Sequence, residues 1–200
     1  MRKPTYLEWE HILLDTSIII SYLNAHRNEK DERCAFVKRI VDDLNSNKNS
    51  DSKARKLYIS SITVAELYDK SDDIKKTEKI VKSLNVKDVS FIAFDSDLAE
   101  HMTSTYHSVL GTDKLKQIAR DLSFPENDLL HGRQWIEKDT MILATCDYLA
   151  CDVVLTTDKK TMLPMAEKLD IYCAVIEKEN FNHNNTYIFD YQPGFGKSTQ

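Results

Sequence analysis

Ile12-Leu13-Leu14-Asp15 is a short apolar run that ends directly in an acid, and Val153-Val154-Leu155-Thr156-Thr157-Asp158 repeats this design near the other end of the chain. A third run of this kind, Leu57-Tyr58-Ile59, lies ahead of Glu66. Short apolar runs bounded by polar residues are typical of strands buried on both faces. Helix-like stretches separate these runs, so the sequence predicts βαβ units and an α/β fold with a mainly parallel central sheet flanked by helices.

Two further strands complete the expected sheet. The five expected strands cover residues 12–14, 57–59, 91–94, 153–155 and 171–175, and the expected helices cover about 16–25, 30–44, 62–68, 75–84, 97–109, 134–150 and 159–168. We expect a polar loop at residues 45–55. Residues 111–132 contain Pro125 and are expected to form an irregular insertion with some helix. The chain thus divides into an N-terminal segment (1–10), one domain (11–178) and a polar C-terminal tail (179–200).

Composition fits a reduced cytoplasmic protein with one core. Of the 200 residues 42% are hydrophobic and 30% are charged, and the four cysteines form no CxxC pair. The first residues lack the apolar core of a signal peptide, and no run is long enough to span a membrane. The net charge of −5 does not by itself suggest a nucleic-acid partner, because phosphate contact normally uses Lys and Arg.

The acids after the strands form a candidate site. In a parallel sheet, ligands bind outside the carboxyl ends of the strands, so Asp15, Glu66 and Asp158 are expected to converge there. A fourth acid, Asp139, lies inside the expected helix 134–150. It shares the helix face made by Trp135, Asp139, Ile142, Cys146 and Leu149, so a carboxylate stands within an apolar stripe. Burying such a charge is costly unless it gains a partner, a shifted pKa or a metal.

Crowded carboxylates repel one another, and a divalent cation is the natural compensation. Ligands that are all oxygen suit Mg²⁺ or Mn²⁺, which keep water molecules and accept phosphate oxygens. An ion of this kind lowers the pKa of a water molecule, which then attacks phosphorus, and a second ion can stabilise the leaving oxygen. This chemistry needs no Ser, Cys or His nucleophile. Arg133 and Lys138, near Asp139, would contact phosphate or pair with the acids.

Each acid also has a structural explanation. Asp15 and Asp158 can each be the N-cap of the helix that follows, and Glu66 can close a capping box with Thr63. Asp139 has no such role, and its alternative is a helix face that turns toward solvent at that point.

In four ordered motifs the chain resembles the PIN-domain nucleases, especially the small VapC-like toxins of bacterial toxin–antitoxin pairs. The motifs are Leu13-Leu14-Asp15-Thr16-Ser17, Ile59-Ser60-Ser61-Ile62-Thr63-Val64-Ala65-Glu66-Leu67, Asp139-Thr140-Met141-Ile142-Leu143-Ala144-Thr145 and Val154-Leu155-Thr156-Thr157-Asp158. The resemblance extends over about residues 11–176.

The resemblance implies a PIN-like three-layer fold and hydrolysis of RNA that depends on Mg²⁺ or Mn²⁺. By likeness Asp15, Glu66, Asp139 and Asp158 would bind metal, and Thr156 would support the site through its hydroxyl. Ser17 would be the small polar residue near the metal. Family likeness also implies a cognate antitoxin and a homodimer as possible partners.

The chain is longer than a typical toxin of this family, with the excess in the 45–55 loop, the 111–132 region and the tail after residue 179. The nuclease role is therefore better founded than the toxin role. The rival hypothesis is a PIN-shaped module that binds RNA or a protein with little or no catalysis.

Overall fold

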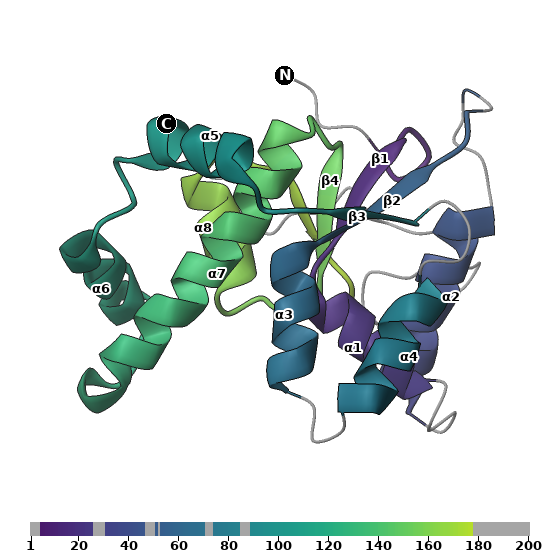
Figure 1. The fold of residues 1–200 in the computed structure, drawn as a ribbon, viewed down its shortest axis with the longest axis horizontal. Helices are drawn as coiled ribbons and strands as arrows, with labels where there is room; N and C mark the ends of the chain where they lie inside the picture. The colour runs from purple at the N-terminus through teal and green to yellow at the C-terminus, as the bar shows by residue number, and fades with distance from the viewer. Residues whose placement is uncertain are drawn as a thin grey trace, which may run out of the picture.

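The computed structural model describes residues 5–25, 31–46, 51, 53–70, 74–84 and 89–177. These form a five-stranded, wholly parallel sheet in the order β3-β2-β1-β4-β5 (Figure 1). The strands are β1 (His11–Leu14), β2 (Lys56–Ser60), β3 (Val89–Ile92), β4 (Val153–Thr156) and β5 (Cys173–Val175). The α/β class and the parallel sheet are confirmed. Strand order reverses between β1 and β4, and ligands bind open sheets of this kind at such a point.

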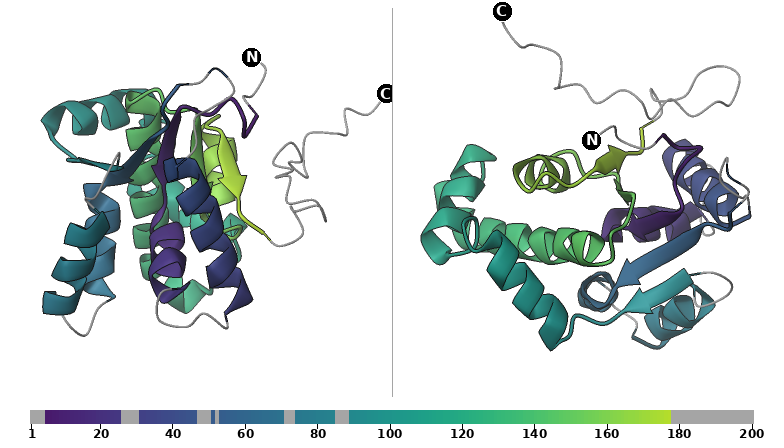
Figure 2. Two further views of the ribbon diagram at one scale, coloured as in Figure 1. Left: turned by 90° about the vertical axis from the view of Figure 1, so that its right-hand side faces the viewer. Right: turned by 90° about the horizontal axis from the view of Figure 1, so that it is seen from above.

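Helices cover both faces of the sheet, which gives three layers (Figure 2). They are α1 (Thr16–Ala25), α2 (Glu32–Ser46), α3 (Ser61–Asp69), α4 (Ile74–Leu84), α5 (Ser96–Tyr106), α6 (Thr112–Asp121), α7 (Leu129–Tyr148) and α8 (Met162–Lys168). Alternate residues of β1 divide between two cores, as the pleat of a strand requires. Ile12 and Leu14 pack with α1 and α2, whereas Leu13 packs with α6, α7 and α8.

The 111–132 region is more regular than the sequence suggested. It holds α6, a 3₁₀ turn at Glu126–Asp128 and the start of α7, so the expectation of an irregular insertion is wrong. Leu115, Ile118 and Ala119 are buried at three- and four-residue spacing and form one apolar face of α6. That face packs against α7, because Leu115 and Ile118 share a core with Ile136 of that helix.

Other boundaries shift by a few residues. β3 begins at Val89 rather than at residue 91, and α7 begins at Leu129 rather than at residue 134. Residues 47–50 and 52 of the expected loop, and the expected tail at 179–200, lie outside the described residues. The division of the chain at residues 11 and 178 stays a prediction.

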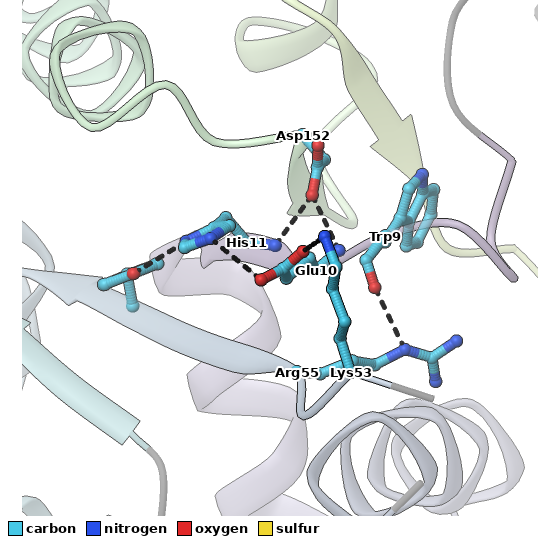
Figure 3. Close-up of polar contacts among 7 residues, drawn as sticks. Trp9, Glu10, His11, Lys53, Arg55 and Asp152 are labelled. Atoms are coloured by element: carbon cyan, nitrogen blue, oxygen red, sulfur yellow. Dashed lines mark hydrogen bonds and ion pairs between the residues drawn. The ribbon is translucent and has the colours of Figure 1, made fainter. Parts of the chain in front are cut away.

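Residues just before β1 are tied to the sheet at its amino end (Figure 3). Asp152 Oδ2 accepts hydrogen bonds of 2.7 Å from the backbone N–H groups of both Glu10 and His11. The Arg55 guanidinium, which is buried, donates to the carbonyls of Tyr6 at 2.9 Å and Trp9 at 3.2 Å. Trp9 itself is fully buried. This network holds β1 and β4 in register at the end opposite to the candidate site.

Helices α6, α7 and α8 end in the same motif without a glycine. After each, a residue with positive φ turns the chain: Ser123 (62°), Ala150 (50°) and Asp170 (56°). At the end of α7, the N–H of Ala150 donates to Asp147 O and the N–H of Cys151 donates to Cys146 O, each at 2.9 Å. This pair of hydrogen bonds defines the Schellman motif. The residue with the left-handed backbone conformation in this motif is usually glycine, because a Cβ atom is disfavoured there.

Replacing Ala150 with glycine is therefore expected to stabilise the protein. The exposed Ala150 side chain is in a conformation that costs an L-residue about 1 kcal/mol relative to glycine. We expect Ala150→Gly to raise the Tm by roughly 2–4 °C in a thermal melt. Ala99→Gly, inside α5, is the matched control and should lower the Tm, since glycine is unfavourable in a helix interior. A lower Tm for Ala150→Gly would contradict the assignment.

Candidate functional site

The site is built where β1 and β4 end side by side. Leu14 pairs with Leu155, and the backbone N–H of Asp15 donates to Leu155 O at 2.9 Å, so Asp15 continues β1 beside β4. Asp15 is 4% exposed. Its Oδ2 accepts hydrogen bonds from Thr156 Oγ1 at 2.7 Å and from Ser17 Oγ at 2.6 Å. Burial raises the pKa of Asp15, and these two hydroxyl groups oppose that shift.

Thr156 connects two of the acids. Its hydroxyl oxygen donates to Asp15 and also accepts a 2.9 Å hydrogen bond from the backbone N–H of Asp158. Ser17 adds a second connection between the strand ends, because its Oγ accepts a 2.8 Å hydrogen bond from the N–H of Thr157. The Thr and Ser singled out in the sequence thus touch Asp15 directly. They fix the position of its carboxylate.

Asp158 closes the turn that leads into α8. Its Oδ1 accepts hydrogen bonds from the N–H groups of Lys160 (2.7 Å) and Thr161 (3.0 Å), and its Oδ2 accepts one from Thr161 Oγ1 at 2.6 Å. The alternative of Asp158 as the N-cap of the following helix is wrong, because α8 begins at Met162 and its N-cap is Thr161. Asp15 likewise accepts from the N–H of Ser17, at 3.3 Å, at the start of α1. Asp15 thus combines a capping role with a place in the candidate site, whereas Asp158 binds the turn that precedes α8.

Glu66 reaches the site from α3. The N-cap of this helix is Ser60, whose side chain accepts from the N–H of Ile62, so the capping-box explanation that paired Thr63 with Glu66 is wrong. Glu66 Oε2 instead accepts a hydrogen bond from the hydroxyl of Thr16, the residue after Asp15. Its Oε1 lies 3.9 Å from Lys138 Nζ, which also lies 3.2 Å from Asp69 Oδ2. Lys138 thus pairs with acids, one of the two roles expected for it.

Asp139 is the least compensated member of the group. Its Oδ2 is buried and has no hydrogen-bond partner among the described residues. Burial raises the pKa of Asp139 well above its ordinary value, and the charges of Asp15, Asp158 and Glu66 raise it further. Hydrogen bonding with Thr161 acts in the opposite direction. The alternative of a helix face that turns this carboxylate out to solvent is wrong for Oδ2.

The four acids therefore share one neighbourhood without enclosing an ion as they stand. The pKa of Asp139 responds to each of the other three, which come from β1, α3 and the end of β4. Within the ranges that the structure describes, no three His, Cys, Asp or Glu side chains are close enough together to hold a metal ion. The acid side chains would have to move closer together to form such a site.

Two contributors were not foreseen from the sequence. Thr16 orients Glu66, and Thr161 lies beside both Asp139 and Asp158. The spacing of Asp158 and Thr161, three residues apart ahead of a helix, is the available signal for the second. Trp135 is a correction: it was placed in the apolar stripe of α7, but its side chain is 56% exposed, whereas Ile142 and Cys146 of that stripe are buried.

Neutralising Asp139 is expected to stabilise the protein without metal. Because the folded pKa of Asp139 is raised, the charged form costs stability, and this cost grows as pH rises from the unfolded pKa through the folded pKa. We expect Asp139→Asn to raise the Tm in EDTA at pH 7.5 by roughly 3–8 °C, and this gain to shrink toward pH 4. Glu137→Gln on the same helix, whose side chain is 46% exposed, should change the Tm little. A lower Tm for Asp139→Asn at pH 7.5 would refute the uncompensated charge.

Comparison with known proteins supports the fold. No family model and no curated protein matches the sequence. A chain of VapBC2 from Rickettsia felis, solved bound to a DNA fragment from its promoter, is 14% identical with a TM-score of 0.50, over 84% of this chain and 99% of that one.

Two other solved structures are similar at lower TM-scores. DNA-bound VapBC from Salmonella typhimurium is 19% identical (TM-score 0.47; 82% of this chain, 96% of that one). VapBC-1 from nontypeable Haemophilus influenzae is 17% identical (TM-score 0.48; 82% and 97%). Within the described ranges, no helix has the length and apolar character needed to cross a bilayer. The parallel sheet with helices on both faces, together with the Rickettsia likeness, identifies the fold of this chain as PIN-like.

Proposed function

We propose that this chain is a divalent-metal-dependent endoribonuclease that hydrolyses phosphodiester bonds in RNA. The observation that carries the proposal is the buried Oδ2 of Asp139, which has no partner in the described part of the chain and lies near three further carboxylates. An uncompensated buried anion costs stability, so its presence at the point where strand order reverses calls for a functional reason. A bound cation supplies that reason.

The donor set fits Mg²⁺ or Mn²⁺. Asp15, Glu66, Asp139 and Asp158 offer only carboxylate oxygens, the ligands that these hard ions prefer. When bound, such an ion neutralises the acids, attracts the phosphodiester and makes a water molecule nucleophilic at neutral pH.

Hydroxyl groups orient two of the acids, Asp15 and Glu66, before substrate arrives. Thr156 and Ser17 both donate to the same oxygen of Asp15, and Thr16 donates to Glu66. Acid side chains that already have a defined orientation need less rearrangement during the reaction. Each hydroxyl acts here as a donor to a carboxylate, and for Asp15 the donation by Ser17 and Thr156 opposes the rise in pKa that burial causes.

We expect two basic residues near the acids to contact the RNA backbone. Lys138 lies between Glu66 and Asp69, and the exposed Arg33 donates to Thr157 O at 3.3 Å. Neither side chain is buried, so each can exchange its present contact for a phosphate. Local positive charge of this kind offsets the net charge of −5 where substrate binds.

The finer proposal is that the nuclease is the toxin of a toxin–antitoxin pair. It is supported by the four ordered motifs and by the fold likeness to the VapBC2 chain. A cognate antitoxin would then be its protein partner, with a homodimer and a cytoplasmic location as further expectations. We expect a small open reading frame next to the gene for this chain. Its product should bind this chain and block cleavage. A gene with no such neighbour would remove the toxin role and leave the nuclease.

A second candidate is a PIN-shaped module that binds RNA or a protein without catalysis. The observation that favours it is that Asp158 and Glu66 already have partners: Asp158 caps a turn, and Glu66 accepts from Thr16 and faces Lys138. In such a module the acids would be structural, and metal would have no effect.

Cleavage is expected to require both the ion and the buried acids. With Mn²⁺, the purified full chain should cut single-stranded RNA, and EDTA should stop the reaction. Asp15→Asn and Asp139→Asn should each lower the cleavage rate on the order of 100-fold or more, because each removes a charged ligand. Asp147→Asn, an acid on α7 that instead contacts His101 and Tyr106, is the control and should keep the activity. Full activity in both site variants would end the assignment.

Mn²⁺ is also expected to stabilise the fold. A ligand that binds only the folded state raises stability by RT ln(1 + [L]/Kd), which is about 2.7 kcal/mol at 100 times Kd. The Tm of the wild-type chain should therefore rise with Mn²⁺ concentration, and that of Asp139→Asn should rise much less. A wild-type Tm that does not respond to Mn²⁺ would favour the binding module.

A further inference from the structure

We propose that Trp135 stacks on an unpaired RNA base next to the bond that is cut, so that the substrate is single-stranded RNA held by a base as well as by phosphate. This inference rests on the proposed function, because it assigns the substrate contact of the same site. It concerns the far end of the α7 face that carries Asp139.

Trp135 is unusual among the large side chains of this protein. It is 56% exposed, whereas the other tryptophan, Trp9, is fully buried. An exposed indole leaves a large apolar surface in water, which is unfavourable unless something covers it. Because Trp135 and Asp139 are four residues apart on α7, the indole lies one helical turn from the acid.

A neighbouring aromatic residue holds the indole in place. The rings of Phe124 and Trp135 have centroids 6.1 Å apart and planes at 89°, an edge-to-face contact that uses at most one face of the indole. Phe124 is itself held close to α7 by Gly132, where an added Cβ would lie only 2.8 Å from Phe124 Cγ. A preorganised ring loses little entropy when a base stacks on it.

The Schellman turn after α6 directs Phe124 to this position. Ser123 adopts positive φ, and the N–H of Phe124 donates to Ala119 O at 3.0 Å. The 111–132 region, which makes this chain longer than a typical VapC-like toxin, therefore supplies the support of the indole. This gives the added segment a role at the site.

Lys160 completes a continuous rim from one acid to the other. Its ammonium lies 4.8 Å from the Phe124 ring centroid, and its backbone N–H donates to Asp158. The order along this rim is thus Asp139, Trp135, Phe124, Lys160 and Asp158. A nucleotide presents a flat base and a negative phosphate together, and this rim presents an aromatic face and a positive charge together.

The polar surroundings of Trp135 favour a base over a protein partner. Gln134 beside it and His131 one turn earlier are exposed polar residues, so the exposed indole has polar neighbours on α7. Leu130, 59% exposed, lies five residues before Trp135 and so about 140° further round the helix. It is a separate apolar residue on the same helix and makes a matched control.

The test compares RNA with the same backbone lacking its bases. We would measure the affinity of full-length Asp139→Asn protein, in EDTA to prevent cleavage, for an unstructured ten-nucleotide RNA, for its abasic counterpart and for an RNA duplex. The unstructured RNA should bind about tenfold more tightly than the abasic strand, since stacking on one aromatic residue contributes roughly that factor. Binding should also quench the fluorescence of Trp135. Because Trp9 is fully buried, a change in tryptophan fluorescence would report on Trp135.

Adding Trp135→Ala should remove the preference for bases while leaving the weaker abasic affinity unchanged. Trp135→Phe keeps a ring and should retain most of the preference, and Leu130→Ala should retain all of it. A purely structural role for Trp135 would instead lower the affinities for both strands equally and overturn the proposal. So would an unchanged base preference accompanied by a change in self-association, which would assign Trp135 to a protein interface.

The outcome for wild-type protein separates the two proposals. If wild-type chain cleaves RNA with Mn²⁺ and Trp135→Ala keeps the base preference, only the stacking role falls. If wild-type chain neither cleaves RNA nor binds either strand, the proposed function falls and the stacking role falls with it.

Discussion

Burial of carboxylates is the constraint around which the candidate site of this protein is arranged. Asp15 and Asp139 both lose hydration on burial, and burial is the main reason that the pKa of each is raised. Asp15 follows β1 beside β4, where the strand order reverses, and α7 brings Asp139 to the same neighbourhood. Core packing on both faces of the sheet supplies the stability that such an arrangement consumes.

Hydrogen bonds and a nearby positive charge compensate the four acids unevenly. Asp15 and Asp158 receive hydroxyl and backbone donors, Glu66 receives a hydroxyl and faces an ammonium group, and Oδ2 of Asp139 receives nothing within the described residues. Threonine and serine suit this task, because a hydroxyl can donate to a carboxylate and accept from a backbone N–H at the same time, as Thr156 does. Because Asp139 is the least compensated of the four acids, we expect a bound positive charge to stabilise its carboxylate the most.

Much of this could be predicted from the sequence, and the failures have physical causes. The strands that carry Asp15 and Asp158 are dense apolar runs, which pattern alone detects well. Some helix was expected in the 111–132 region, but the bounds of α6 were not predicted, because only three of its ten residues are apolar and buried and its pattern is clear only beside α7. Helical periodicity placed Trp135 on the correct face, yet it cannot tell where along a face the neighbouring elements stop covering it. The contact between Thr16 and Glu66 depends on side-chain geometry, which no spacing rule contains, whereas the spacing of Asp158 and Thr161 was an available signal. The metal and the substrate remain proposals.

The hydrogen bond between Thr156 and Asp15 joins residues that are 141 positions apart. A chain emerging from the ribosome makes its first acid early and the residue that fixes it very late. A nascent chain that does not yet include β4 contains Asp15 without the strand that carries Thr156. A truncated messenger RNA that ends before β4 therefore encodes only part of the candidate site. Asp15 therefore gains its Thr156 partner only after four of the five strands of the described sheet have been made.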